Sequence, residues 1–114
     1  MPNTYTQIYV MLVFAVKGHN QLIHDDIEER IHKYISGTVK NFSQKFICIN
    51  GMPDHVHILF SMAPKNSLSD VVKEIKVSSS KMINEAKMFE GKFHWQTGYG
   101  AFSYSRSQLE DVIA

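Results

Sequence analysis

Two histidines, His55 and His57, are separated by a single valine within a PDHVH stretch that continues as ILF. A β-strand points successive side chains to opposite faces, so both imidazoles should emerge on one face while Val56, Ile58 and Phe60 fill the other. Imidazole nitrogens are common metal ligands, and two of them held side by side on a rigid strand supply half of a metal site. The spacing therefore predicts a metal-binding face on a half-buried strand.

Length and composition are those of one soluble domain spanning residues 1–114. The chain is 44% hydrophobic, which is ordinary for a globular protein of 114 residues. No apolar run reaches the roughly 20 residues needed to span a bilayer, and the N-terminus lacks the pattern of a signal peptide. We therefore expect a cytoplasmic protein. Its one cysteine, Cys48, excludes an internal disulfide and a zinc site built from several cysteines.

The formal net charge is only +1, so charge alone does not mark a nucleic-acid-binding protein. Lysines are concentrated in the second half of the chain but have acids among them, as on a solvated helix face. If the chain binds nucleic acid on other grounds, the candidate phosphate contacts are Lys17, Lys73 and Lys76. Trp95 and Tyr99 are candidates for stacking on an unpaired base, although each type of side chain more often packs in a core.

The elements that must position the histidine pair follow from periodicity. Alternating side chains predict a long strand over 6–17, with both faces apolar as in a central strand. An amphipathic stripe predicts a helix over 25–40, with acids near its N-terminus. A short strand over 45–49 precedes Asn50-Gly51, a hairpin turn signal that leads into the histidine strand over 54–62.

The second half of the chain again alternates between helix and strand. A capping box at 67–70 opens a second helix that Gly91 closes. The three serines at 78–80 indicate either a close contact with the sheet or hydroxyl donors for phosphate. An aromatic-rich fourth strand is predicted over 93–96 and 98–104, and a last, short helix begins after residue 105.

This order, β-α-β-β-α-β, predicts the α+β ferredoxin-like arrangement, also called the split βαβ fold. It consists of a four-stranded antiparallel sheet with two helices on one face, here followed by an incomplete C-terminal helix. The helices should cover the face that carries Val56, Ile58 and Phe60. The face that carries His55 and His57 should then stay open.

Five blocks of the sequence, taken in order, also carry a family resemblance. They are VFAVKG at 13–18, IHKYI at 31–35, NGMPDHVHIL at 50–59, VVKEIK at 71–76 and WQTGYGAFS at 95–103. Together they resemble the single-tyrosine HUH transposases of the insertion sequence 200/605 type, including the relatives associated with repetitive extragenic palindromes (REP). A lone His-x-His would be a weak signal among six histidines, whereas five ordered blocks over nearly the whole length are specific.

The resemblance implies metal-dependent cleavage and rejoining of DNA strands in transposition. In this family two histidines, here His55 and His57, hold Mg²⁺ or Mn²⁺ with help from a polar side chain of the final helix. A tyrosine of that helix attacks the phosphate and forms a 5′-phosphotyrosine, so no nucleotide cofactor is required. Because Mg²⁺ prefers oxygen ligands, we expect weak metal binding without DNA. The implied partners are single-stranded DNA with hairpins and a second copy of the chain, joined through sheet edges.

One departure from the family concerns the nucleophile. The family's tyrosine is expected at or just past the end of this chain, and no tyrosine occurs between Ser105 and Ala114. Tyr104 is the nearest substitute, but it precedes the predicted helix. We therefore expect a domain truncated before the tyrosine helix is complete, which keeps the fold and two metal ligands. The alternatives are a DNA-hairpin-binding remnant that does not cleave, and an unrelated ferredoxin-like domain that binds zinc, copper or another ligand.

Overall fold

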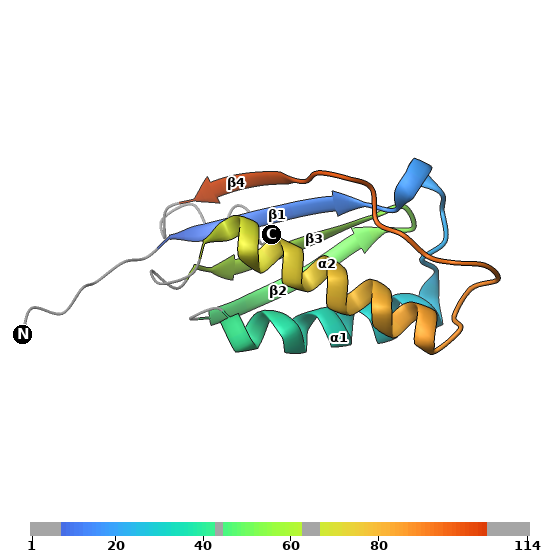
Figure 1. The fold of residues 1–114 in the computed structure, drawn as a ribbon. Helices are drawn as coiled ribbons and strands as arrows, with labels where there is room; N and C mark the ends of the chain where they lie inside the picture. Colours follow the sequence, from blue (N-terminus) through green and yellow to red (C-terminus); the bar gives the residue numbers. More distant parts are fainter. Residues whose placement is uncertain (1–7, 43–44, 63–66, 105–114) are drawn as a thin grey trace, which may run out of the picture.

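The computed structural model describes residues 8–42, 45–62 and 67–104 (Figure 1). Within these residues the elements follow the predicted order of strands and helices. They are β1 (Tyr9–Ala15), the short 3₁₀ helix η1 (Lys17–His19), α1 (Asp25–Phe42), β2 (Lys45–Met52), β3 (His55–Ser61), α2 (Leu68–Glu85) and β4 (Gly100–Tyr104).

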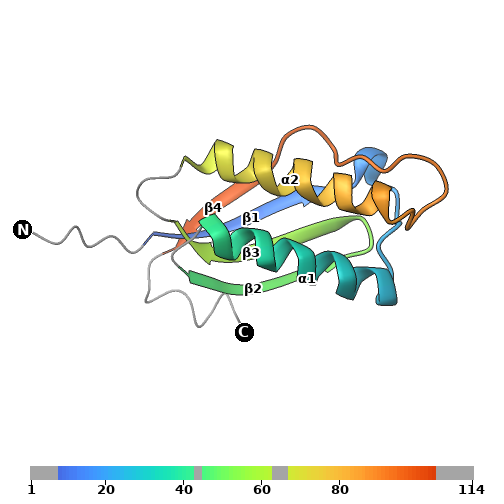
Figure 2. The same cartoon turned by 60° about the horizontal axis from the view of Figure 1, so that its bottom comes forward.

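The strands form one sheet in the order β2-β3-β1-β4, with every neighbouring pair antiparallel. Both helices cover the same face of this sheet (Figures 1 and 2). The α+β, ferredoxin-like arrangement is thereby confirmed, as is the central position of β1. None of the helices among the described residues is long and apolar enough to cross a membrane.

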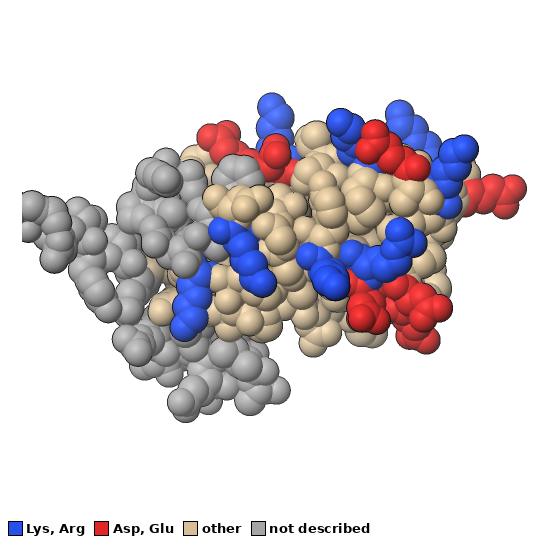
Figure 3. All heavy atoms as spheres, turned by 90° about the horizontal axis from the view of Figure 1, so that it is seen from below, with Lys and Arg blue, Asp and Glu red and all other residues tan. Residues whose placement is uncertain are grey.

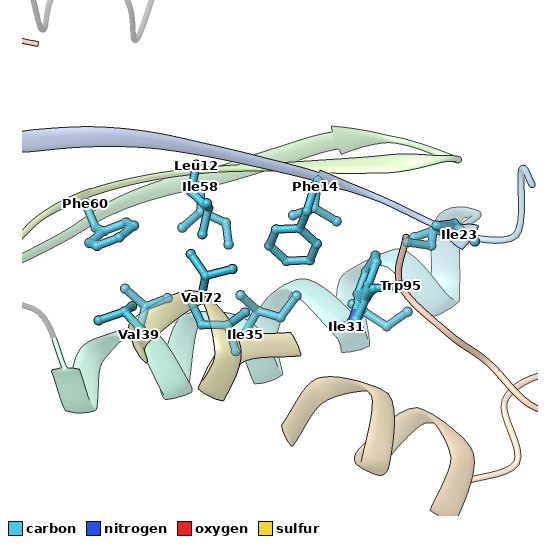
Figure 4. Packing of buried hydrophobic residues seen from close by; sticks show 14 of the residues in the cluster. Leu12, Phe14, Ile23, Ile31, Ile35, Val39, Ile58, Phe60, Val72 and Trp95 are labelled. Carbon is cyan, nitrogen blue, oxygen red and sulfur yellow. The ribbon is translucent and has the colours of Figure 1, made fainter. Parts of the chain in front are cut away.

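The core lies between the sheet and the two helices (Figure 4). The strands β1 and β3 and both helices contribute the apolar residues of one face, and the members with almost no exposure include Leu12, Phe14, Ile31, Ile35, Val39, Ile58, Phe60 and Val72. Burying one such side chain contributes roughly 1.5–3 kcal/mol. The alternation along β3 is therefore strongly fixed, because a shift of one residue would place its histidines in this core.

The hairpin between β2 and β3 differs from the prediction. Asn50 and Gly51 belong to β2, and the turn consists of Pro53 and Asp54. A Cβ added at Gly51 would lie 2.5 Å from the carbonyl oxygen of His55, so glycine is needed for a close approach of two strands. Glycine marks many turns, but at position 51 it is needed because two strands approach closely.

The prediction was also wrong about other boundaries. Trp95 forms only an isolated bridge with Val16, so residues 93–99 are an extended connection and the fourth strand is limited to β4. The second helix ends at Glu85, well before Gly91. Its start is confirmed, since the Ser67 hydroxyl accepts a hydrogen bond from the Asp70 amide at 3.2 Å. The predicted last helix lies outside the described residues.

Charged side chains are mixed on the outer face of the helices. Seen from that side, lysine and arginine side chains alternate with aspartate and glutamate side chains (Figure 3). The acidic residues of the first turn of α1 are Asp25, Asp26 and Glu28. In the view of Figure 3 the described part of this face therefore carries no large patch of one sign.

Candidate metal and nucleic-acid site at the histidine pair

The two histidines lie where the alternation predicts. His55 and His57 pair with Ala15 and Val13 of β1, and both rings are partly exposed on the face opposite the helices. Their ring centroids are 4.8 Å apart, and the ring planes are inclined by 34°. The side chains are therefore near enough to bind one ligand together.

A carboxylate orients the first ring. Asp54 Oδ1 lies 2.7 Å from His55 Nδ1. An ionised carboxylate can only accept a hydrogen bond, so this contact requires the proton of a neutral imidazole to be on Nδ1. The lone pair is then on Nε2, which is the arrangement found in carboxylate–histidine–metal sites. Sequence reasoning missed this role of Asp54, although its position next to a candidate ligand was a usable signal.

The second ring is kept neutral. The pKa of His57 is lowered, first because burial penalises the charged imidazolium and second because His55 stands beside it. A neutral imidazole retains a nitrogen lone pair, as a metal ligand must. The local electrostatics therefore favour the cation-binding form of His57.

The turn that carries the pair is tied to the rest of the fold by two backbone hydrogen bonds. The carbonyl of Asp54 accepts from the Val16 amide at 2.8 Å, and the carbonyl of Pro53 accepts from the Ile23 amide at 2.9 Å. Val16 and Ile23 are both buried. The position of the first histidine is thus fixed by the segment that follows β1.

A pocket of about 390 Å³ opens beside the two imidazoles. Its walls come from β1, β3 and the connection before β4: Val13, Phe14, Ala15, His55, His57, Gln96, Thr97, Gly98, Tyr99 and Gly100. The Tyr99 side chain is 44% exposed, which leaves it accessible to a ligand. A volume of this size is typical of sites that bind small molecules or parts of larger ones.

Trp95 does not lie in this pocket. Its side chain is 9% exposed, and its Nε1 donates to the buried Ser79 hydroxyl at 2.9 Å. Phe14 and Phe93 pack edge-to-face against the ring. Trp95 is therefore a core residue, and its burial removes the ring face that stacking on a base would need. Of the three serines, only Ser79 is buried, and its contact is with Trp95 in the connection before β4; the hydroxyls of Ser78 and Ser80 donate to carbonyls of their own helix.

The three candidate lysines lie outside the pocket lining. Lys17 and Lys73 are exposed, on η1 and α2. Lys76 is partly buried, and its Nζ donates to the carbonyls of Gln96 at 2.7 Å and Gly98 at 2.5 Å. At least two of the three donors of Lys76 are thus directed to the protein itself.

Tyr104 is far from the histidines. It pairs with Tyr9 at one end of β1, whereas His57 pairs with Val13. Four residues of strand correspond to about 14 Å, so Tyr104 is poorly placed as a nucleophile for the same site.

The described residues supply an incomplete set of metal ligands. They contain no group of three or more histidine, cysteine, aspartate or glutamate side chains that could hold a metal ion. The two imidazoles fit a divalent cation as a partial set, and further ligands would have to be water or substrate oxygens. Residues 105–114, where the last helix is predicted to begin, lie outside the described residues, and the family's third ligand was expected beyond them.

Comparison with known proteins identifies the family. The sequence model described as "Transposase IS200 like" matches residues 4–114. The chain belongs to the IS200-like transposase family. The resemblance predicted from the five sequence blocks is thereby confirmed.

Individual relatives agree with this assignment. The IS200-like chain is 25% identical over 116 residues to the ISDra2 transposase TnpA of Deinococcus radiodurans, covering 94% of the chain and 82% of that relative. It also matches the crystal structure of a protein described as a transposase of D. radiodurans R1, with a TM-score of 0.82 and 21% identity over 99% of the chain and 93% of that structure. A REP-associated tyrosine transposase, bound to a REP hairpin, matches with a TM-score of 0.66 and 12% identity over 99% and 66%.

Proposed function

We propose that the chain binds single-stranded DNA beside a hairpin and places one backbone phosphate at His55 and His57, as part of DNA transposition. The observation that carries the proposal is the pair of adjacent imidazoles in an accessible pocket, in a chain of the IS200-like family. The solved relative bound to a REP hairpin supports hairpin DNA as the class of partner.

In this proposal the pair holds Mg²⁺ or Mn²⁺, with His55 binding through Nε2. When bound, the ion would polarise the phosphate that is to be cleaved. Two imidazoles make a poor site for Mg²⁺, so DNA oxygens and water complete the ligand set. Calorimetry should therefore detect little Mg²⁺ binding to the free protein. Tight binding of Mg²⁺ in the absence of DNA would contradict this part of the proposal.

The DNA itself contacts the pocket and its surroundings. Tyr99 stacks on an unpaired base, an interaction worth roughly 1–3 kcal/mol per base. Lys17 and Lys73 are exposed and contact phosphates, which makes binding weaker at high salt without adding sequence preference. Binding should accordingly fall steeply with ionic strength, and the Tyr99→Ala variant should bind about tenfold more weakly.

A direct test uses a hairpin-bearing single-stranded oligonucleotide and Mn²⁺. Fluorescence anisotropy should show that the His55→Gln/His57→Gln double variant loses the Mn²⁺-dependent part of the affinity. His24→Gln is the matched control, because His24 is exposed and absent from the lining of the histidine pocket. Equal Mn²⁺-dependent affinity of the double variant and the wild-type protein would refute the proposed site.

We also propose that this chain does not cleave through Tyr104, because of its distance from the pair. After incubation with the same DNA and Mn²⁺, a denaturing gel should show no covalent protein–DNA adduct that depends on Tyr104. An adduct that disappears in Tyr104→Phe would overturn this. An adduct that disappears in Tyr99→Phe instead would assign the nucleophile to the pocket wall.

A further inference from the structure

One face of α2 fixes the connection that leads to the histidine pocket. Asn84 accepts from the Phe93 amide at 2.7 Å and donates to the Phe93 carbonyl at 3.1 Å. Five residues earlier, Ser79 accepts the hydrogen bond of the Trp95 ring. Three residues before that, Lys76 donates to two carbonyls of the connection. α2 thus holds residues 93–98 from three positions, alongside the backbone hydrogen bonds that join His94 to Lys17 and Gln96 to Ala15.

Lys76 is the member of this face that reaches the pocket wall. Its ammonium lies 5.7 Å from the centre of the Phe14 ring and is partly buried, which lowers its pKa. The ion pairs found among the described residues do not involve it. Its positive charge is therefore held next to the carbonyls of Gln96 and Gly98 without a carboxylate beside it.

The direction of these carbonyls determines the direction of the next amides. A trans peptide is planar, so its C=O and the following N–H point to opposite sides, and no cis peptide occurs here. Since the carbonyls of Gln96 and Gly98 point to Lys76, the N–H groups of Thr97 and Tyr99 point away from it. No hydrogen bond from either N–H occurs within the described residues.

Residues 96–98 line two hollows. One of these hollows is also lined by Lys76, and the other, the histidine pocket, is also lined by His55 and His57. Gly98, which lines both hollows, has a φ of +89°, and an added Cβ there would have no atom within 4 Å. The backbone here is therefore open to close approach by a ligand.

We propose that Lys76 is a positioning residue that turns the N–H groups of Thr97 and Tyr99 into the histidine pocket, where they bind a non-bridging oxygen of the DNA phosphate. Backbone amides directed at one point form an anion site, and their hydrogen bonds to a charged oxygen are stronger than neutral ones. This inference rests on the proposed function, because it concerns the same bound phosphate.

The test follows backbone amide signals by NMR while a thymidine tetranucleotide is added in the presence of Mg²⁺. The amide resonances of Thr97 and Tyr99 should shift, together with the ring resonances of His55 and His57. A tetranucleotide with uncharged methylphosphonate linkages should leave the two amide resonances in place, which separates anion binding from base stacking.

Variants then test the role of the lysine. Lys76→Met should weaken the tetranucleotide response at Thr97 and Tyr99 about tenfold, because the carbonyls lose their donor. Lys76→Arg should restore much of it, since a guanidinium can also donate to two carbonyls. Lys81→Met removes an exposed charge from the same helix and should behave as the wild-type protein.

The outcomes separate the two proposals. Shifts of the histidine rings without shifts of the two amides would overturn the anion site and leave the proposed function standing. No shift at either place would overturn the anion site, and the hairpin-bearing oligonucleotide then decides the proposed function separately. The titration of the wild-type protein decides this even if Lys76→Met does not fold.

Discussion

Gly51 shows how one absent methyl group sets the distance between the histidine strand and its neighbour. A Cβ at this position would meet the backbone oxygen of His55 at 2.5 Å, so β2 and β3 would have to separate. Gly51→Ala should therefore lower the free energy of unfolding by about 1–3 kcal/mol in urea titrations. Gly37→Ala is the matched control: Gly37 lies in α1 with nothing near an added Cβ, and the change should stabilise by about 0.5–1 kcal/mol.

His32 links stability to pH. Its Nε2 is buried and has no hydrogen-bond partner among the described residues, and burial lowers its pKa despite the opposing effect of Glu28. As the pH falls through the ordinary histidine pKa of about 6.5, the unfolded chain takes up the proton first, so stability falls. His32→Gln should make the free energy of unfolding vary less between pH 7 and pH 5. An unchanged slope in urea titrations at several pH values would count against this assignment.

Among the elements, α2 contributes most to holding the connection before β4, because its polar residues bond to that connection, which has no regular partner strand. Asn84→Ala would leave the amide and carbonyl of Phe93 without their side-chain partner. Unfolding experiments should show a loss of about 1–3 kcal/mol. Ser80→Ala on the same helix removes only a bond to the helix's own Val77 carbonyl and should change stability by less than about 0.5 kcal/mol.

Elements with strong periodicity were predictable from the sequence, whereas their ends were not. The stripes of α1 and α2 and the alternation of β1 and β3 predict which faces are buried. The turn between β2 and β3 was placed too early, because Asn50-Gly51 is a local signal and the close contact of Gly51 with His55 is visible only across strands. Residues 93–96 were predicted as part of a strand because they are rich in aromatic residues, but the side chains of Phe93 and Trp95 enter the core beyond the sheet.

In the candidate site, the histidine pair was predictable from the sequence, whereas the roles of Trp95 and Lys76 were not. The adjacency of His55 and His57 follows from strand geometry alone. The burial of Trp95 and the two carbonyl partners of Lys76 depend on residues about 16 to 22 positions away. No local pattern marks a helical lysine that bonds to a distant backbone, so these roles required the structure.

At the scale of the whole molecule, the sheet edge at β4 is a candidate surface for joining two copies of the chain. Three consecutive residues of this edge strand are exposed, and Phe102 is 56% exposed. A dimer joined here would protect the edge from other pairings. Light scattering should give a mass twice 13.1 kDa for the wild-type protein and near 13.1 kDa for Phe102→Lys. Met52→Lys, a similar change on the opposite edge strand, should leave the dimer intact; a monomeric wild-type protein would contradict the assignment.

The two hydrogen bonds that tie Pro53 and Asp54 to the segment after β1 have a kinetic consequence. With the hairpin tip anchored, the imidazoles do not have to be assembled when a ligand arrives, and no slow rearrangement should precede capture. In rapid-mixing experiments the observed rate should rise linearly with oligonucleotide concentration instead of levelling off.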